Sequence, residues 1–433
     1  MVIMKRMNSA EIFGRACAVI PGGVNSPVRS FKAMGISPPL IVESGAGDLI
    51  RDVDGHELID FCGSWGALIL GHAHPEIVRA AQDQMAKGST FGIATAIEEK
   101  IARKVVDLIP SVEKIRFLCS GTEAGMTVIR LARGFTERAK IVKFTGHYHG
   151  HTDSLLIQAG SGVASINPLA TSKGVNAGVI ADTICLPFND FQAVRSFFRT
   201  SPLASQVAAV ILEPVTGNMG VVLPEPGFLE MLREETERAG ALLIFDEVIT
   251  GFRVGLKGAQ GLYGIDPDLT CFGKVIGGGF PVAAVGGKAK ILDCLAPLGQ
   301  VYQAGTLAGS PVAMRAGLET LQIIEKDGFY KKLQEKTDRI TLPIEDALAE
   351  KNGCLQKCGS MFSIFFGLKK VASKEDLKRL DEAMFVRFFR YLFERGIYIP
   401  PSSHEAWFIS SAHTEEHLDT TALCITSFID TYL

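Results

Sequence analysis

The chain has 433 residues, of which 47% are hydrophobic and 21% charged, and its 44 basic and 47 acidic residues give a net charge of −3. This composition can bury a large core and argues against disorder, and the length predicts two or three domains. A near-neutral balance without a basic run argues against a nucleic-acid partner.

The N-terminus and the cysteines indicate the compartment. The first seven residues lack the apolar core of a signal peptide, and no stretch reaches the roughly 18 uninterrupted apolar residues of a membrane span. The nine cysteines are odd in number and scattered, which fits free thiols better than a disulfide framework or structural zinc. We expect a soluble cytoplasmic protein with no membrane partner.

Three regions follow one another along the chain. Residues 1–64 are expected to form an N-terminal segment, with a helix and then a hairpin over 48–60 around Asp54-Gly55. Residues 65–310 alternate short apolar runs with amphipathic stretches, the pattern of a mostly parallel sheet covered by helices on both faces. The predicted strands are 115–118, 141–144, 207–212, 241–245, 269–272 and 282–285, and the clearest helices are 122–133 and 226–238.

The remaining residues, 311–433, predict a smaller α+β domain. A long helical pattern opens it, and apolar runs and further helical patterns follow. The expected elements are helix 312–324, strand 362–366, helix 376–395, strand 398–400 and helix 415–432.

Two charged residues follow apolar strands in the α/β region, where ligands bind outside the carboxyl ends of the strands. Asp246 follows strand 241–245, and a carboxylate there is costly unless a cation pairs with it. Lys274 lies between strand 269–272 and the glycine triplet 277–279, a position suited to a desolvated amine that reacts with a carbonyl. Taken alone, either residue is explained as well by an ordinary structural role.

Two further strand ends add a phosphate site and an aromatic ring. Ser120, Gly121 and Thr122 open a helix whose N–H groups suit a phosphate, although Ser or Thr before a helix is ordinarily only a cap. Tyr148 follows strand 141–144 and is able to stack on a flat ring. Amine, carboxylate, phosphate cradle and aromatic together predict a site for pyridoxal 5'-phosphate or pyridoxamine 5'-phosphate.

The chain resembles the glutamate-1-semialdehyde 2,1-aminomutases, which belong to the pyridoxal-phosphate class that includes the class-III aminotransferases. The resemblance covers nearly the whole chain, and it implies the aspartate-aminotransferase-like fold of pyridoxal-phosphate-dependent transferases. It rests on Pro21–Arg29 (PGGVNSPVR), 71–75 (GHAHP), 120–124 (SGTEA), 148–151 (YHGH), 159–164 (AGSGVA), Glu213-Pro214, Gly217-Asn218, 246–248 (DEV), 273–279 (GKVIGGG), 302–306 (YQAGT) and 412–416 (AHTEE).

The resemblance implies a role for each site residue. Lys274 is implied to bind the cofactor aldehyde and act as acid and base, and Asp246 to partner the pyridinium nitrogen. The other cofactor-binding residues are Ser120, Gly121, Thr122, Tyr148, Asn218, Val248 and Thr306, the last reaching the phosphate from the second subunit of a homodimer. The substrate-binding residues are Ser26, Arg29, Trp65, Ser161 and Glu405, of which Arg29 holds the carboxylate and Ser161 belongs to a mobile lid.

The implied reaction converts glutamate-1-semialdehyde into 5-aminolevulinate for tetrapyrrole synthesis. A transaminase that exchanges with glutamate needs a cation for the carboxylate beside the reacting carbon, but segment 400–412 contains no arginine and offers Glu405. This favours a mutase over the alternatives, a class-III aminotransferase or an amino-acid racemase. His404 departs from the family, which usually has an aromatic residue there.

Two other classes of protein fit less well. His72, His74 and the three histidines of 147–151 suggest a metal-dependent hydrolase. However, those three lie in a glycine-rich turn, and we expect no metal. The glycine-rich stretches fit neither the dinucleotide fingerprint nor a P-loop. A non-enzymatic scaffold would leave the pair of Lys274 and Asp246 without a purpose.

Overall fold

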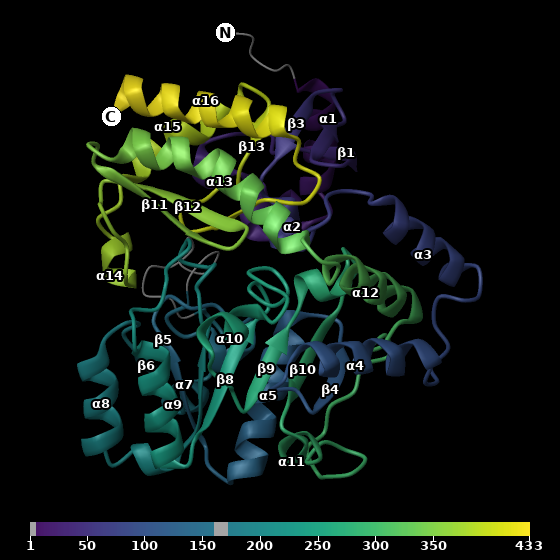
Figure 1. The fold of residues 1–433 in the computed structure, drawn as a ribbon, viewed down its shortest axis with the longest axis vertical. Coiled ribbons are helices and arrows are strands. Elements are labelled where there is room, and N and C mark those ends of the chain that lie inside the picture. Colours follow the sequence, from purple (N-terminus) through teal and green to yellow (C-terminus); the bar gives the residue numbers. More distant parts are fainter. Residues whose placement is uncertain (1–5, 160–171) are drawn as a thin grey trace.

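The computed structural model describes residues 6–159 and 172–433. The largest sheet that the described residues form has seven strands (Figure 1). All strands are parallel except β10, which is antiparallel to both neighbours. In spatial order they are β4 (Lys114–Leu118), β10 (Ala283–Gly287), β9 (Leu269–Phe272), β8 (Leu242–Glu247), β7 (Val207–Leu212), β5 (Lys140–Phe144) and β6 (Thr183–Leu186).

Helices cover both faces of this sheet because its central strands are apolar on both sides. In β7, Val210 and Leu212 pack into one core cluster with α9 (Phe228–Ala239), whereas Ala209 and Ile211 pack into another with α5 (Gly121–Thr136). Alternate residues of a strand point to opposite faces, so one strand supplies both layers. The α/β architecture with a mostly parallel sheet is confirmed.

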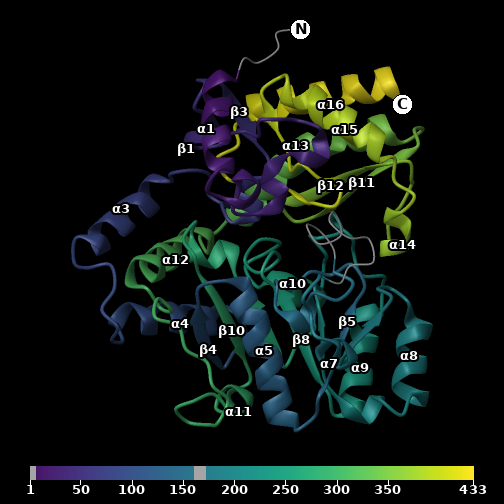
Figure 2. The same cartoon turned by 180° about the vertical axis from the view of Figure 1, so that it is seen from behind.

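The two ends of the chain pack together on the other side of the molecule. The predicted hairpin forms as β2 (Leu49–Asp52) and β3 (Glu57–Asp60), with β1 (Val42–Ala46) beside β2. β13 (Ile397–Tyr398) completes this sheet by pairing in parallel with β3. Figures 1 and 2 show the N-terminal elements in purple beside the C-terminal helices in yellow.

A third sheet lies in the C-terminal part, in the order β11 (Gly353–Cys358), β12 (Met361–Phe366) and β14 (Trp407–Phe408). It is packed by α13 (Phe329–Leu348), α15 (Glu382–Phe393) and α16 (Glu415–Tyr432). The single helix predicted over 376–395 is wrong. Two helices form there, α14 (Lys374–Leu377) and α15, because the chain has two N-caps: Ser373 caps the first, and Asp381 accepts a hydrogen bond from Met384 N to begin the second.

The other elements connect these sheets. β6 was not predicted, because a short edge strand of mixed burial lacks a continuous apolar run. No helix in the described ranges is both long and apolar enough to span a membrane. The remaining helices are α1 (Met7–Cys17), α2 (Gly63–Gly66), α3 (Pro75–Met85), α4 (Ala96–Leu108), α7 (Ala177–Ala181), α8 (Phe191–Thr200), α10 (Gly258–Tyr263), α11 (Ala289–Leu292) and α12 (Pro311–Ile324), with 3-10 turns η1 (Pro21–Gly23), η2 (Pro27–Ser30), η3 (Lys32–Met34), η4 (Asp153–Leu155), η5 (Ala204–Gln206) and η6 (Lys274–Gly277).

Gly278 offers a test of how tightly α12 packs behind Lys274. Its φ is +57°, and an added Cβ would lie 2.4 Å from Thr320 Oγ1 and 2.8 Å from Ala316 O. We predict that Gly278→Ala lowers stability by about 3 kcal/mol, the sum of left-handed strain and a clash with backbone. Gly264→Ala is the matched control, because its φ is +67° but nothing lies within 4 Å. Thermal melting of both variants should give a clearly larger fall in Tm for Gly278→Ala, and equal falls would contradict the packing argument.

Candidate active site

A cavity of 330 Å³ lies at the carboxyl ends of the sheet strands, a size that suits a small cofactor. Its walls come from the segments that follow β4, β5, β7, β8 and β9. It brings together all the predicted cofactor-binding residues except Thr306: Ser120, Gly121, Thr122, Tyr148, Asn218, Asp246, Val248 and Lys274.

Asp246 is a buried carboxylate within β8, one residue inside the strand rather than after it as predicted. Its Oδ2 lies 2.7 Å from His149 Nδ1, and its Oδ1 accepts a hydrogen bond from Val248 N at 3.1 Å. His149 is also buried, so neither group reaches bulk water to be stabilised there. The pair therefore holds one carboxylate in a defined orientation against the cavity.

The N-terminus of α5 forms the opposite end of the cavity. Ser120 Oγ is already used, because it accepts a hydrogen bond from Glu123 N at 3.2 Å. Thr122 Oγ1 accepts one from His151 N at 3.2 Å. The N–H groups of Gly121 and Thr122, which these hydrogen bonds do not use, lie at the positive end of a 16-residue helix, an arrangement suited to an anion such as a phosphate.

Glu213 holds the loops on the other side of the cavity, and the sequence reasoning gave it no role. One oxygen accepts from Tyr148 N at 2.9 Å, and the other accepts from Gly217 N at 2.8 Å and from Asn218 Nδ2 at 3.0 Å. Burial raises the pKa of this carboxyl, and the His149 imidazole opposes that shift. The signal that would have found Glu213 is the one that found Asp246, an acid at the end of an apolar strand.

Lys274 enters the same cavity from η6 with a backbone φ of 51°. A left-handed non-glycine residue is strained, and such strain is concentrated at functional positions. Burial lowers the pKa of Lys274 below its usual value, while the negative charges of Glu405, Glu213 and Asp246 act in the opposite direction. The amine is thus more easily neutral than an exposed lysine.

Of the predicted substrate-binding residues, Glu405 lies close to this amine. It is buried, and its charge raises the pKa of both Lys274 and Tyr148. Trp65 lies on α2, which packs against η6, and its backbone hydrogen-bonds to the buried Cys62 thiol. The two residues come from the C-terminal and N-terminal parts of the chain, Glu405 acting on the amine by its charge and Trp65 through the packing of α2 against η6.

Arg29 and Ser26 lie further out, at η2. The Arg29 side chain is exposed, and its charge acts on Tyr398, whose hydroxyl hydrogen-bonds to Cys62. Ser26 precedes η2 and is partly buried. Ser161 lies outside the described residues.

Thr306 does not reach this cavity in its own chain. It is exposed and lines a separate cavity of 450 Å³, together with residues 90–94. This placement is what a contribution to a second subunit requires.

The histidines that suggested a metal site in the sequence contact other groups in the structure. His147 Nδ1 accepts a hydrogen bond from Glu213 N at 3.0 Å, and burial holds the pKa of His147 well below its usual value. His72 Nε2 lies 2.7 Å from Asp60 Oδ2. Within the ranges 6–159 and 172–433, no three His, Cys, Asp or Glu side chains form a group able to hold a metal.

Comparison with known proteins agrees with this geometry. Residues 32–425 match the model of the family described as aminotransferase class-III. The chain belongs to the class-III aminotransferase family. It is 53% identical to the glutamate-1-semialdehyde 2,1-aminomutase of Protochlamydia amoebophila (strain UWE25) over 99% of both chains.

Two solved structures share the fold. An omega-transaminase from Sphaerobacter thermophilus superposes with a TM-score of 0.89 at 32% identity, covering 98% of this chain and 97% of its own. A structure described as a transaminase with PLP bound gives 0.87 at 31% identity, covering 100% and 98%. The aspartate-aminotransferase-like fold expected from the resemblance is thus confirmed.

The charge of Glu405 predicts a pH effect that is measured on the apo chain. Only a neutral amine attacks an aldehyde, so the rate at which Lys274 captures pyridoxal phosphate rises as pH rises through the pKa of Lys274. Glu405→Gln removes a charge that raises this pKa, so the midpoint should move to lower pH. Stopped-flow absorbance between pH 6 and 10 gives the midpoint.

Glu237→Gln, a change on an exposed side chain of α9, is the matched control and should leave the midpoint unchanged. A midpoint that stays in place or rises in Glu405→Gln contradicts the proximity of the two groups.

Proposed function

We propose that this chain is a glutamate-1-semialdehyde 2,1-aminomutase, an isomerase that moves the amino group of (S)-4-amino-5-oxopentanoate to the adjacent carbon and yields 5-aminolevulinate, a precursor of tetrapyrroles. Its cofactor is pyridoxal 5'-phosphate, alternating with the pyridoxamine form. Identity of 53% over the full chain to a curated aminomutase exceeds by 21 percentage points the 32% to an omega-transaminase.

The cavity fits this cofactor at each of its polar positions. The N-terminus of α5 would take the phosphate, Tyr148 and Val248 would flank the ring, and Asp246 would face the ring nitrogen. Lys274 would hold the aldehyde carbon covalently. When bound, the ring supplies an electron sink for the charge that develops on a substrate carbon.

Asp246 would keep a proton on the ring nitrogen of the bound cofactor. Its carboxylate is buried at the cavity and oriented by His149 Nδ1 at 2.7 Å and Val248 N at 3.1 Å, so its negative charge acts in a medium of low dielectric. A cation beside it is strongly favoured there. The protonated nitrogen is what makes the ring electron-poor.

Lys274 moves the proton between the two reacting carbons. Burial lowers the pKa of its amine, so that the neutral amine that takes up a proton forms more readily than in an exposed lysine, and the resulting ammonium returns the proton to the adjacent carbon. The three surrounding carboxylates, those of Glu405, Glu213 and Asp246, stabilise that ammonium. The same group thus serves as base and then as acid.

The buried carboxylate of Glu405 is the main support for a mutase rather than a transaminase. A keto-acid or amino-acid partner would place a second carboxylate beside the reacting carbon, and the buried Glu405 would repel it. Segment 400–412 provides no arginine to offset that repulsion. An uncharged aldehyde or amine is accepted at this end, while the single substrate carboxylate would be held by Arg29 with Ser26 at the outer end.

Glutamate-1-semialdehyde supplied without any keto acid or amino donor should give 5-aminolevulinate, because the amino group stays within one substrate skeleton. Lys274→Ala should lower the rate more than about a thousandfold by removing the proton carrier. Colorimetric detection of the product measures both. Product that forms only when an amino donor or acceptor is added would instead establish the transaminase alternative, which the likeness to omega-transaminases favours.

We further infer that the chain is a homodimer whose active sites lie at the subunit interface. Thr306 and residues 90–94 line one open cavity, and Phe91, Ile93, Tyr302 and Leu307 nearby are more than half exposed. Apolar side chains of this size rarely stay exposed together on a monomer.

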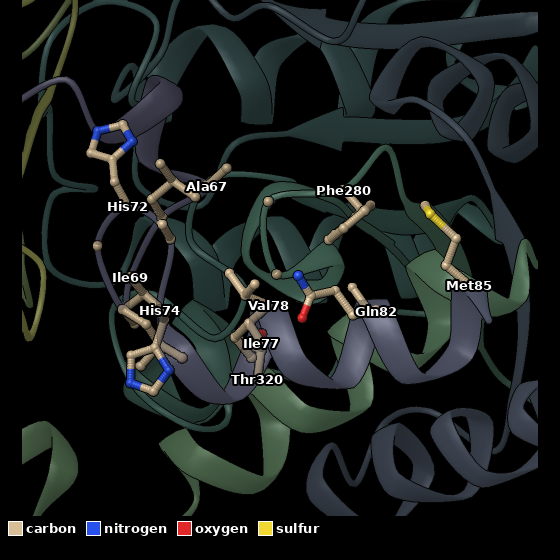
Figure 3. A pocket seen from close by; sticks show the side chains of 17 residues that line it. Ala67, Ile69, His72, His74, Ile77, Val78, Gln82, Met85, Phe280 and Thr320 are labelled. Atoms are coloured by element: carbon tan, nitrogen blue, oxygen red, sulfur yellow. The ribbon is translucent and has the colours of Figure 1, made fainter. Parts of the chain in front are cut away.

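Another cavity, of 390 Å³ and largely apolar, lies between α3 and α12 (Figure 3). Ile77, Val78 and Met85 of α3 line one side of it, and Thr320 of α12 another. Phe280 lines both this cavity and the cofactor cavity. A partner seated here would therefore touch the wall of the active site.

Mixed dimers test the contribution of Thr306. Lys274→Ala and Thr306→Glu chains should each have little activity alone, the second because a carboxylate would repel the phosphate. When the two are co-expressed, half of the dimers carry one intact site, and about a quarter of wild-type activity should return. Co-expression of wild type with the double variant Lys274→Ala/Thr306→Glu is the mirror control, whose hybrids carry no intact site. The wild-type homodimers in this control give about a quarter of wild-type activity by themselves. About half of wild-type activity in the control, together with none in the mixture, would place Thr306 at its own chain's site.

A cytoplasmic location is also part of this proposal. All nine cysteines are free, although several lie in a buried core where a disulfide would add stability. This usage is typical of a reducing compartment.

A further inference from the structure

Arg253 is a fully buried arginine that the proposed reaction does not use. It lies in the turn after β8, and it is 1% exposed. Within the described part of the chain it forms no ion pair with a carboxylate, and its Nε has no hydrogen-bond partner. Burying a cation in this way is unfavourable, and burial lowers the pKa of Arg253. Such a group is retained for what its hydrogen bonds hold in place.

Its guanidinium joins three separate parts of the chain. Nη2 donates to Gly66 O at 2.7 Å, and Nη1 donates to Ile409 O at 2.8 Å and to Ser360 Oγ at 3.2 Å. Its Cζ also lies 5.5 Å from the centroid of the Phe408 ring, which offers the cation the face of an aromatic in place of water. Reaching these acceptors requires the several N–H donors that a planar guanidinium holds apart. A lysine has a single ammonium nitrogen and no such fork of donors.

The segment that Arg253 holds, α2, is strained. All four of its residues are left-handed, and two of them are not glycine: Ser64 has a φ of 53° and Trp65 of 59°. A Cβ on Gly66 would lie 2.6 Å from the Phe408 ring, so the turn is pressed against β14. Two consecutive strained non-glycine residues persist only where surrounding contacts determine them.

The strained turn lies beside the reacting amine. α2 packs against η6, which carries Lys274, and against β14. The hydrogen bond from Arg253 to Gly66 O fixes the C-terminal end of the turn, one residue after Trp65. We propose that Arg253 is a positioning residue that holds the left-handed turn of α2 and thereby the indole of Trp65 at the substrate side of the active site.

This proposal rests on the proposed function for the assignment of Trp65 to the substrate. The proposed role of Arg253 does not concern the cofactor, because none of the residues that accept its hydrogen bonds lines the cofactor cavity. The expected signature of losing Arg253 is a weaker hold on substrate with an unchanged cofactor spectrum.

Arg253→Lys in the holoenzyme should raise KM about tenfold, the effect of losing a charged hydrogen bond, with kcat within about twofold and the cofactor absorbance band intact. Ser64→Gly should restore much of this loss when added to Arg253→Lys, because glycine adopts the left-handed conformation without the contact that enforces it. A structural role alone predicts a lower Tm, an unchanged KM and no such rescue, and that outcome would overturn the proposal.

Tryptophan fluorescence provides a readout that is independent of turnover. The chain has two tryptophans, and Trp407 is 1% exposed, so acrylamide quenching of the holoenzyme reports mainly on Trp65. Arg253→Lys should increase quenching, and the double variant with Ser64→Gly should bring it back. Unchanged quenching in Arg253→Lys overturns the positioning role even if the chain proves to catalyse a different reaction.

Ser360→Ala covers the case in which Arg253→Lys does not fold. It removes the hydrogen bond from Nη1 to Ser360 Oγ and the one at 3.4 Å from Ser360 Oγ to Arg253 O, and it leaves the guanidinium in place. A rise in KM and in quenching of the same direction but smaller size supports the proposal, and no change in either contradicts it.

Discussion

One half-buried amine, that of Lys274, lies among the carboxylates of Glu213, Asp246 and Glu405, and the rest of the active site is arranged around that balance of charge. Burial alone would drive the amine to neutrality, and the three acids alone would keep it protonated. Together they leave its pKa below the usual value but opposed by each neighbouring charge. An amine in that state is suited to take up a proton and give it back.

Each acid needs its own neutralising contacts, and these contacts build the walls of the cavity. Asp246 is held by His149 and Val248 N, and Glu213 is held by three donors from the loops that carry Tyr148, Gly217 and Asn218. The cofactor loops are therefore positioned by the same hydrogen bonds that make the buried charges tolerable. The same hydrogen bonds thus stabilise the buried charges and fix the loops, because a buried carboxylate without hydrogen-bond donors is strongly unfavourable.

Glu405 and Trp65 come from the other side of the molecule, where the two ends of the chain share the sheet formed by β3 and β13. Arg253 reaches across this boundary, from the turn after β8 to Gly66 O and Ile409 O. A buried guanidinium with only neutral acceptors lowers the stability of the fold, and so does the strained turn at Ser64 and Trp65. Both lie next to η6, the turn that carries Lys274, through the packing of α2 against it.

The sequence by itself determined the elements whose patterns are local. β7 and β9 were predicted to the residue, because apolar runs end where polar side chains begin, and Asp246 and Lys274 stood out as polar groups at such ends. Only the tertiary structure decided the partners of those groups. Nothing local to Glu213, His149 or Arg253 specifies which distant groups they contact. For Thr306 the family resemblance already implied a place outside its own cofactor cavity, and the structure places it at a separate cavity. Hydrophobic periodicity is read along a segment, whereas the pairing of buried polar groups is set by contacts between segments far apart in the chain.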